Sequence, residues 1–185
     1  MSVTLQPNIK RGFTIVELLI VIVVIAILAA ISIVAYNGIQ NRAHNSELYS
    51  GVDAYHKAIK LYAVDEGTYP ATSPAACFGG NAVLGAGSDQ CSTVNTLYKI
   101  NTTFDNSIKK YMGGSIPKMS LKTLTGTYNG NPVSLHTSGA YGVYTGKPAI
   151  YYYPLATNCR SGEVHITSYT FTTDAKMCVI PLPDL

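Results

Sequence analysis

A single carboxylate lies near the start of a long apolar stretch. Glu17 is followed almost without interruption by apolar residues as far as Tyr36, and the basic pair Lys10 and Arg11 precedes it. A charged side chain in hydrocarbon costs about 2.5 to 3.5 kcal/mol on insertion scales, so an acid in such a place is by default functional and paired. The stretch holds no basic side chain that could be its partner. The alternative is a glutamate that snorkels, or is neutral, near a helix N-terminus whose dipole favours it.

The other side chains that could do chemistry are scattered along the chain. The four histidines are His44, His56, His136 and His165, and Asp53 precedes His56 by one helical turn. Two residues without a third ligand are more typical of a surface pair than of a metal site. No nucleophile elbow, HExxH motif, phosphate-binding loop or dinucleotide fingerprint occurs in a suitable context. We therefore expect no enzymatic activity, no metal and no cofactor.

The four cysteines, Cys77, Cys91, Cys159 and Cys178, all follow the apolar stretch. They form no CxxC pair, so a zinc site is poorly supported. If this part of the chain is exported, two disulfides are expected instead. Three connectivities are possible, and the sequential pairs Cys77–Cys91 and Cys159–Cys178 close the shortest loops.

Four lysines gather around a tyrosine in the middle of the chain. Lys109, Lys110, Lys118 and Lys122 surround Tyr111. Basic residues beside an aromatic ring can bind DNA or another anionic polymer. A solvated, charged loop is the more common reason for such a run, and we favour that interpretation.

Length, composition and net charge limit the classes of protein to which this chain can belong. The chain has 185 residues, of which 47% are hydrophobic and 12% charged, with a formal net charge of +3. This length supports one ordinary domain plus an extra element. The small net charge disfavours a nucleic-acid binder that relies on bulk charge.

The apolar stretch predicts a membrane-spanning helix over residues 13–36. At about 1.5 Å per residue it is just long enough for a hydrocarbon core of about 30 Å. The basic pair before it predicts a cytoplasmic N-terminus and an exported C-terminal part. A secretory signal fits less well, because the apolar run is long and no A-x-A exit follows it.

Helical periodicity continues beyond the apolar stretch and predicts one long helix from about residue 13 to residue 65. Its expected buried face consists of Leu48, Val52, Tyr55, Ile59 and Tyr62. Its expected wet face consists of Asn45, Glu47, Asp53, Lys57 and Lys60. The glycines Gly38, next to Asn37, and Gly51 are its weak points. Gly67 is expected to terminate the helix, with Pro70 shortly after it.

The remainder of the chain predicts a β-rich head. Short segments rich in aromatic and β-branched residues occur at 132–136, 140–146, 148–154, 163–171 and 176–180, separated by turn signals. We expect an antiparallel sheet of four or five strands, with Tyr152 on the opposite face from Tyr151 and Tyr153. The fold class is therefore α+β, with a long N-terminal helix packed on the sheet.

The stretch "KRGFTIVELLIVIVVIAILAAI" resembles the leader and N-terminal helix of type IV prepilins and pseudopilins. The resemblance combines a short basic leader ending in Gly12, a phenylalanine directly after it, Glu17 as the fifth residue from Phe13, and an apolar helix. It covers about the first third of the chain, and "GTYP" at 67–70 is also common in the family. Many pilins have a proline in the apolar helix near Val34, where this chain has none.

The resemblance implies that a prepilin peptidase cuts between Gly12 and Phe13 and that the new amino group of Phe13 is methylated. Glu17 would then pair with such an amine, on its own or a neighbouring subunit, and so set the register between helices. The expected organisation is a cleaved leader (1–12), a membrane and assembly segment (13–36), an amphipathic segment (37–66) and a head (67–185). The pair Cys159–Cys178 resembles the C-terminal disulfide loop of many pilins.

The expected function is that of a structural subunit which polymerises into a type IV pilus or pilus-like surface filament. Its expected partners are other pilins, the prepilin peptidase and methyltransferase, and the membrane platform of the assembly machinery. It would lie in the cytoplasmic membrane before assembly and in an extracellular filament afterwards. The alternatives are a pseudopilin of a type II secretion system, or a membrane-anchored module that binds DNA or another ligand.

Overall fold

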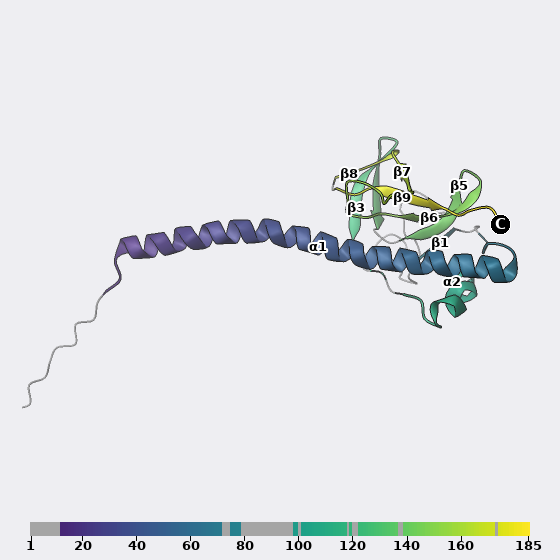
Figure 1. Ribbon diagram of the computed structural model, residues 1–185. Helices are drawn as coiled ribbons and strands as arrows, with labels where there is room; N and C mark the ends of the chain where they lie inside the picture. Colours follow the sequence, from purple (N-terminus) through teal and green to yellow (C-terminus); the bar gives the residue numbers. More distant parts are fainter. Residues whose placement is uncertain are drawn as a thin grey trace, which may run out of the picture. The chain divides into compact units, whose positions relative to one another are not determined.

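The computed structural model describes residues 12–71, 75–78, 98–99, 101–117, 119, 122–136, 139–172 and 174–185. The chain divides into two compact units, Met1–Gln40 and Asn41–Leu185. Helix α1, Ile15–Glu66, begins in the first unit and ends in the second (Figure 1). Strands follow it, so the predicted α+β architecture and the predicted long helix are both confirmed.

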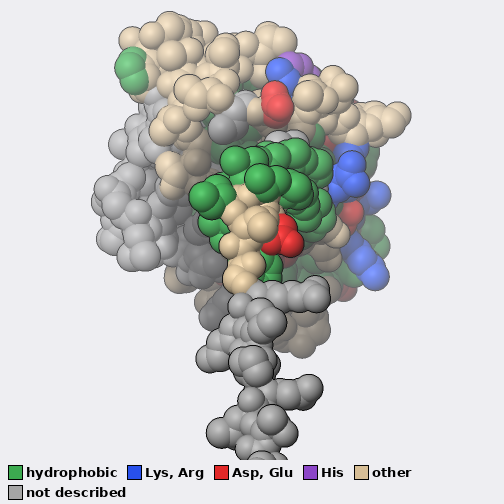
Figure 2. All heavy atoms as spheres, turned by 90° about the vertical axis from the view of Figure 1, so that its left-hand side faces the viewer, with side chains coloured by type: hydrophobic (Ala, Val, Ile, Leu, Met, Phe, Trp, Pro, Cys, Tyr) green, Lys and Arg blue, Asp and Glu red, His purple; other side chains and the backbone are tan. Residues whose placement is uncertain are grey.

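In the first unit, α1 is apolar on all sides. Its described large hydrophobic side chains between Ile15 and Ile39 are exposed by 47% or more. Figure 2 shows hydrophobic side chains around this part of the helix. Among the described residues, one helix is long and apolar enough to cross a membrane, judged by length and composition. A helix that is hydrophobic all round needs lipid or other helices around it.

In the second unit, α1 buries the face that the sequence predicts. Leu48, Val52, Tyr55 and Ile59 are each at most 1% exposed, and Tyr62 is half-buried. The helix ends at Glu66, and Gly67 follows it with a φ of +69°, the left-handed conformation expected of a terminating glycine. The amphipathic half of the helix therefore packs onto the rest of its unit as predicted.

Two residues of this half differ from their predicted roles. Asn45, expected on the wet face, is half-buried, and its side chain exchanges two hydrogen bonds of 2.8 Å with the backbone of Leu155. Gly51, expected as a weak point, faces the buried Met119, and a Cβ atom there would lie 3.0 Å from two side-chain atoms of that methionine. The missing side chain thus makes room for a core residue.

The strands form two sheets. The larger has the order β2-β1-β5-β6-β9-β7, and the smaller has the order β4-β3-β8. Their bounds are β1 Ala75–Cys77, β2 Tyr98–Lys99, β3 Thr123–Tyr128, β4 Asn131–His136, β5 Ala140–Tyr144, β6 Lys147–Tyr152, β7 Val164–Ile166, β8 Tyr169–Phe171 and β9 Met177–Pro181. A short helix, α2 (Thr102–Lys109), continues into the 3-10 turn η1 (Lys110–Met112). Neighbouring strands are antiparallel except for β1 and β2.

The predicted strands at 132–136, 140–146, 148–154 and 176–180 correspond to β4, β5, β6 and β9. The prediction of one strand over 163–171 is wrong, because a turn at Thr167 and Ser168 divides it into β7 and β8, which join different sheets. The prediction of a single sheet is wrong for the same reason. Strand β3 was not predicted, since Gly126 interrupts its pattern. A Cβ atom at Gly126 would lie 2.2 Å from the carbonyl oxygen of Thr170, so glycine permits the close pairing with β8.

The larger sheet has a hydrophobic cluster on each face. Tyr152 belongs to the cluster that contains Leu48 and Tyr55 of α1. Tyr151 and Tyr153 belong to the other cluster, which includes residues of β3 and is bordered by β8. The predicted alternation of the three tyrosines is confirmed, and it gives the second unit three layers: helix, six-stranded sheet and three-stranded sheet.

Candidate functional site

The start of α1 is closed by reciprocal hydrogen bonds between Thr14 and Glu17. The Thr14 backbone N–H and the Thr14 hydroxyl each donate to Glu17 Oε2 at 2.8 Å, and the Glu17 N–H donates to Thr14 Oγ1 at 3.2 Å. This is a capping box, in which residue types T-x-x-E satisfy two backbone donors at a helix N-terminus. Sequence reasoning missed Thr14, although the T-x-x-E spacing was the signal for it.

Gly12 and Phe13 lie directly before this capping box. Phe13 is 89% exposed, and a Cβ atom on Gly12 would meet nothing within 4 Å. The fold of this chain therefore places no steric demand for glycine at position 12. Lys10 and Arg11 lie outside the described residues.

Glu17 is consequently a carboxylate at the first turn of an exposed, apolar helix. Both hydrogen bonds from Thr14 go to Oε2, and among the described residues no hydrogen bond goes to Oε1. An apolar helix of this kind offers a surface for lipid or for other helices. The carboxylate adds one position along this helix where a cation can bind. A cation carried by a second helix would therefore fix the axial offset between the two helices.

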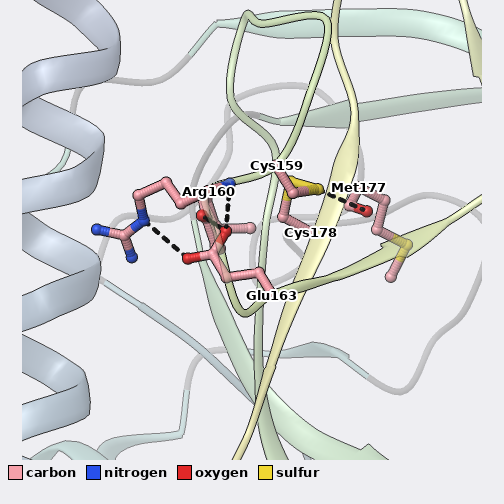
Figure 3. Close-up of a disulfide and its surroundings, with 6 residues drawn as sticks. Cys159, Arg160, Glu163, Met177 and Cys178 are labelled. Carbon is pink, nitrogen blue, oxygen red and sulfur yellow. Dashed lines mark hydrogen bonds and ion pairs between the residues drawn. A yellow bond between two sulfur atoms is a disulfide. The ribbon is translucent and has the colours of Figure 1, made fainter.

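A second constellation surrounds a disulfide in the second unit (Figure 3). Cys159 and Cys178 are bonded with an S–S distance of 2.04 Å, which confirms this predicted pair and joins the segment after β6 to β9. Cys77 is buried in β1, but Cys91 lies outside the described residues, so the first predicted pair stays a prediction.

Arg160, next to this disulfide, ties the same segment to α1. Its Nε lies 2.7 Å from Glu163 Oε1 and its Nη1 lies 2.9 Å from Asp53 Oδ1. The guanidinium carbon also lies 4.9 Å from the ring centroid of Tyr49 on α1. The Tyr152 hydroxyl donates a hydrogen bond to Glu163, and burial together with this bond raises the pKa of Tyr152. Sequence reasoning missed Arg160 and Glu163, whose i, i+3 spacing was the available signal.

The same constellation contains a group with metal-ligand elements. A sulfur atom of Cys159, a sulfur atom of Cys178 and a carboxylate oxygen of Glu163 lie within 4.8 Å of one another. Metal binding requires thiolates, which the disulfide bond removes. Glu163 is also occupied by Arg160, so this arrangement is structural rather than a metal centre.

The predicted pair of Asp53 and His56 does not form a shared site with a third ligand among the residues that the structure describes. Asp53 pairs with Arg160 instead. The pKa of His56 is lowered by burial and by the nearby Lys60. His44 is buried, and burial followed by the nearby charge of Lys122 lowers its pKa as well. Of the other histidines, His165 is exposed on β7, and the side chain of His136 lies outside the described residues.

The structure separates two members of the lysine cluster, Lys110 and Lys122. Lys110 pairs with Asp65 at 2.9 Å and with Glu66 at 3.4 Å, near the end of α1. Lys122 donates to Asn41 at 3.1 Å, and at 1.5 Å per residue Asn41 and Asp65 lie about 36 Å apart along α1. Lys109 lies in the last turn of α2, and Lys118 lies outside the described residues. The separation of Lys110 from Lys122 does not favour one compact anion-binding site, and because Lys118 lies outside the described residues the anion-binding interpretation stays a prediction.

Asp105 of α2 is a buried acid that sequence reasoning missed. The residue is 9% exposed, and among the described residues its Oδ1 has no hydrogen-bond partner. Burial raises the pKa of its carboxyl group to about 6. Its position in a short, mostly polar helix gave no signal of burial in the sequence.

The comparisons with known proteins match part of the chain. The family model of the prokaryotic N-terminal methylation motif matches residues 7–33. Fimbrial protein EcpC of Eikenella corrodens is 40% identical over 69 residues, which are 37% of this chain and 45% of that protein. Type IV major pilin protein PilE1 of Neisseria gonorrhoeae is 36% identical over 68 residues, 37% of this chain and 32% of that protein.

A type II secretion protein is similar over a comparable length. Type II secretion system core protein G of Klebsiella michiganensis is 33% identical over 63 residues, which are 34% of this chain and 44% of that protein. The chain thus spans less than half the length of these curated relatives. No solved structure matches it with statistical significance. The chain therefore carries the prokaryotic N-terminal methylation motif at residues 7–33 and is similar, over about a third of its length, to type IV pilins and to a type II secretion core protein.

Proposed function

We propose that this chain is a structural, non-enzymatic subunit that polymerises into a type IV pilus or a pilus-like surface filament. The observation that carries the proposal is Glu17, a carboxylate at the first turn of an exposed apolar helix, inside the matched methylation motif. Polymerisation would surround residues 13–36 with equivalent helices of other subunits in place of lipid.

Processing of the N-terminus would prepare the chain for this role. A prepilin peptidase would cut between Gly12 and Phe13, and the new amino group of Phe13 would be methylated. The fold has room for a side chain at position 12, so packing does not explain the glycine there. This supports recognition of Gly12 by another molecule. The small residue would let the backbone enter a narrow cleft.

Glu17 would then set the register between helices. A Phe13 amine that binds Glu17 of a neighbouring subunit would offset two parallel helices by about 6 Å, since the residues are four positions apart. Wrong registers would leave a charge unpaired in an apolar environment. The free Oε1 atom supports this role, because the amine can bind it while Thr14 stays bound to Oε2.

Before assembly the chain would lie in the cytoplasmic membrane, with its N-terminus inside and the second unit outside. Its partners would be other copies of itself or related pilins, the processing enzyme and the assembly platform. The disulfide Cys159–Cys178 supports an oxidising location for the second unit.

Two substitutions separate the capping role of Glu17 from its charge. Glu17→Gln keeps an acceptor for the capping box, in which glutamine is also accepted, but removes the charge. Thr14→Val removes the side-chain partner of Glu17 in the cap and keeps the carboxylate, at a cost of about 1 kcal/mol in helix stability. We expect Glu17→Gln to give a membrane-inserted, processed monomer with at least about a tenfold lower filament yield, and Thr14→Val to retain filaments.

Electron microscopy of sheared surface fibres and mass spectrometry of the native N-terminus are the measurements. Mass spectrometry should find an N-terminal Phe13 with one added methyl group. Normal filaments from Glu17→Gln would contradict the register role. A native protein that begins at Met1 would contradict the processing itself.

The similarity to a type II secretion core protein favours a second candidate, a pseudopilin. It shares the processing and the role of Glu17 and differs in what the polymer does. A deletion strain that lacks secreted enzymes but shows no loss of surface fibres would favour the pseudopilin. Loss of fibres with normal secretion would favour the pilus subunit.

A further inference from the structure

A cavity of about 530 Å³ in the second unit is lined by residues from three parts of the chain. Asn41 of α1 is the first residue of this unit, Lys122 directly precedes β3, and Asp174 follows β8. We call this depression the β3–β8 cavity. Its volume falls within the range of about 300 to 1,000 Å³ that is typical of ligand sites.

Strand pairing brings the two charged residues to the same edge of the smaller sheet. Strands β3 and β8 are antiparallel, so the start of β3 lies beside the end of β8. The pairing continues one residue past β8, where the Thr172 N–H donates to the Thr125 carbonyl oxygen at 3.0 Å. Lys122 lies three residues from this bond along one strand, and Asp174 lies two residues from it along the other. The ammonium and the carboxylate therefore line one cavity.

The lining of the β3–β8 cavity combines both charges with apolar surface. Lys122 Nζ donates to Asn41 Oδ1 at 3.1 Å, and an ammonium group has three N–H donors in all. Asp174 is exposed, and its carboxylate can accept several hydrogen bonds. Leu155 and Phe171 are half-buried and lie beside these groups in the lining. A ligand with a short apolar part and both charges would match all of these features.

The charges favour a zwitterionic ligand. An anion would be attracted by Lys122 and repelled by Asp174, and a cation would meet the reverse. The neighbouring cavity shares Asp174 and adds Lys176, so a ligand confined to the β3–β8 cavity meets one charge of each sign. A phosphoethanolamine group carries a phosphate that can bind the lysine and a primary ammonium that can donate to the aspartate. The trimethylammonium group of phosphocholine has no N–H to donate.

The position of Asn41 in the chain selects a membrane lipid as the source of this group. This step rests on the proposed function, in which residues 13–36 span the membrane before assembly. Asn41 follows Tyr36 by five residues, which measure about 7.5 Å as helix and at most about 18 Å as extended chain. The headgroup layer on each side of a bilayer is about 5 to 7 Å thick. Asn41 would therefore lie within reach of lipid headgroups.

We propose that the β3–β8 cavity binds the headgroup of a phosphatidylethanolamine lipid in the outer leaflet of the cytoplasmic membrane. Lys122 binds the lipid phosphate, and Asp174 accepts hydrogen bonds from the lipid ammonium group. Leu155 and Phe171 contact the glycerol carbons. The site deepens the proposed function by giving the unassembled subunit a lipid partner, which it releases when it leaves the membrane for the filament.

The test uses the full-length protein in nanodiscs made of phosphatidylcholine alone, with added phosphatidylethanolamine, or with added anionic phosphatidylglycerol. Native mass spectrometry of the released chain identifies the lipids that stay bound. We expect phosphatidylethanolamine to be retained at least about fivefold more than either other lipid, as charge-assisted hydrogen bonds at both ends of the headgroup would give. Lys122→Gln and Asp174→Asn replace one charged group each by an amide, and each should abolish this preference.

Two exposed residues outside the described lining of the cavity supply matched controls. Arg42→Gln removes a cation next to Asn41, and Asp184→Asn makes the same change as Asp174→Asn. Both should keep the preference, and circular dichroism should show that every variant is folded. The proposal is overturned by equal retention of the three lipids, by a preference for phosphatidylglycerol, or by equal losses in Lys122→Gln and Arg42→Gln.

Further measurements separate the lipid site from other outcomes. Free phosphoethanolamine is added to the detergent-solubilised chain, and binding as tight as that of the lipid would overturn the lipid as the occupant. Insertion into nanodiscs and filament yield are scored for the same protein. A chain that inserts and polymerises without a lipid preference contradicts this inference alone, whereas a chain that does not insert contradicts both the inference and the proposed membrane location.

Discussion

Replacing Asp105 by asparagine is expected to remove a pH dependence from the stability of the second unit. Burial raises the pKa of this carboxyl group from 3.8 to about 6, and the difference corresponds to about 3 kcal/mol of unfolding free energy. Because the folded-state pKa is the higher one, the protonated form is the one that the fold tolerates. The stabilisation is complete below about pH 3.8, falls as pH rises, and is lost above about pH 6.

The assay is thermal unfolding of the detergent-solubilised chain, monitored by near-ultraviolet circular dichroism of its tyrosines between pH 4 and pH 7.5.

Two histidines change the stability with pH in the direction opposite to Asp105. Burial lowers the pKa values of His44 and His56, so the stability that they contribute is lost as pH falls below their ordinary value of 6.5. In the parent chain these effects partly cancel. Asp105→Asn should expose the histidine effect as a steady loss of stability towards low pH.

The control for this measurement is Asp184→Asn, at an exposed carboxylate paired with Lys147 at 2.6 Å. It should keep the pH profile of the parent chain. Parallel profiles for the parent chain and Asp105→Asn would refute the reasoning, because they would mean that Asp105 releases its proton as easily in the folded chain as in the unfolded one.

Two further pairs of variants test the packing of the second unit and of α1. Arg160→Met should lower the unfolding free energy by about 2 kcal/mol or more, because it leaves the nearly buried Glu163 carboxylate without its cation. Lys147→Met breaks an exposed pair and should cost less than about 1 kcal/mol; equal losses in thermal unfolding would contradict this difference. Gly38→Ala should stabilise its part of α1 by up to about 1 kcal/mol, because no atom lies within 4 Å of the added Cβ. Slower amide exchange in this part of the helix would measure the gain. Gly51→Ala should gain less, since Met119 lies 3.0 Å from the added Cβ, and a larger gain there would count against the packing argument.

Periodicity in the sequence was sufficient to predict α1 and its buried face. Leu48, Val52, Tyr55 and Ile59 repeat at helical spacing, and all four are buried where expected. Gly67 and the proline after it marked the end of the helix. These signals are local, so they do not depend on which partner the helix packs against.

The strand topology depended on contacts that are distant in sequence. The segment 163–171 carries a continuous β pattern, but the turn at Thr167 and Ser168 sends its two halves to different sheets. Strand β3 contains Gly126, which lowers strand propensity, yet glycine is needed because the Thr170 carbonyl approaches so closely. Neither feature has a signature in its own stretch of residues.

The lysine cluster shows why proximity in sequence was a poor guide to proximity in space. Lys110 and Lys122 lie near opposite ends of the packed part of α1, and each has a polar partner on that helix. Arg160 gave no comparable sequence run, yet it joins Glu163, Asp53 and an aromatic ring in one network. A single long side chain that contacts several elements, such as Arg160, therefore connects more of this surface than the run of lysines does.

The capping box changes how the lone acid of the apolar helix is understood. Thr14 supplies two hydrogen bonds to Glu17, so the carboxylate is partly satisfied without any charged partner. Under the proposed function, these bonds would lower the cost of holding the carboxylate in the membrane before assembly. The same geometry aims both bonds at one oxygen and keeps the second available for an amine. Under the proposed function, the amine of a second subunit or of the processed N-terminus would supply the cation that Glu17 lacks, and this missing partner would favour association of the helices.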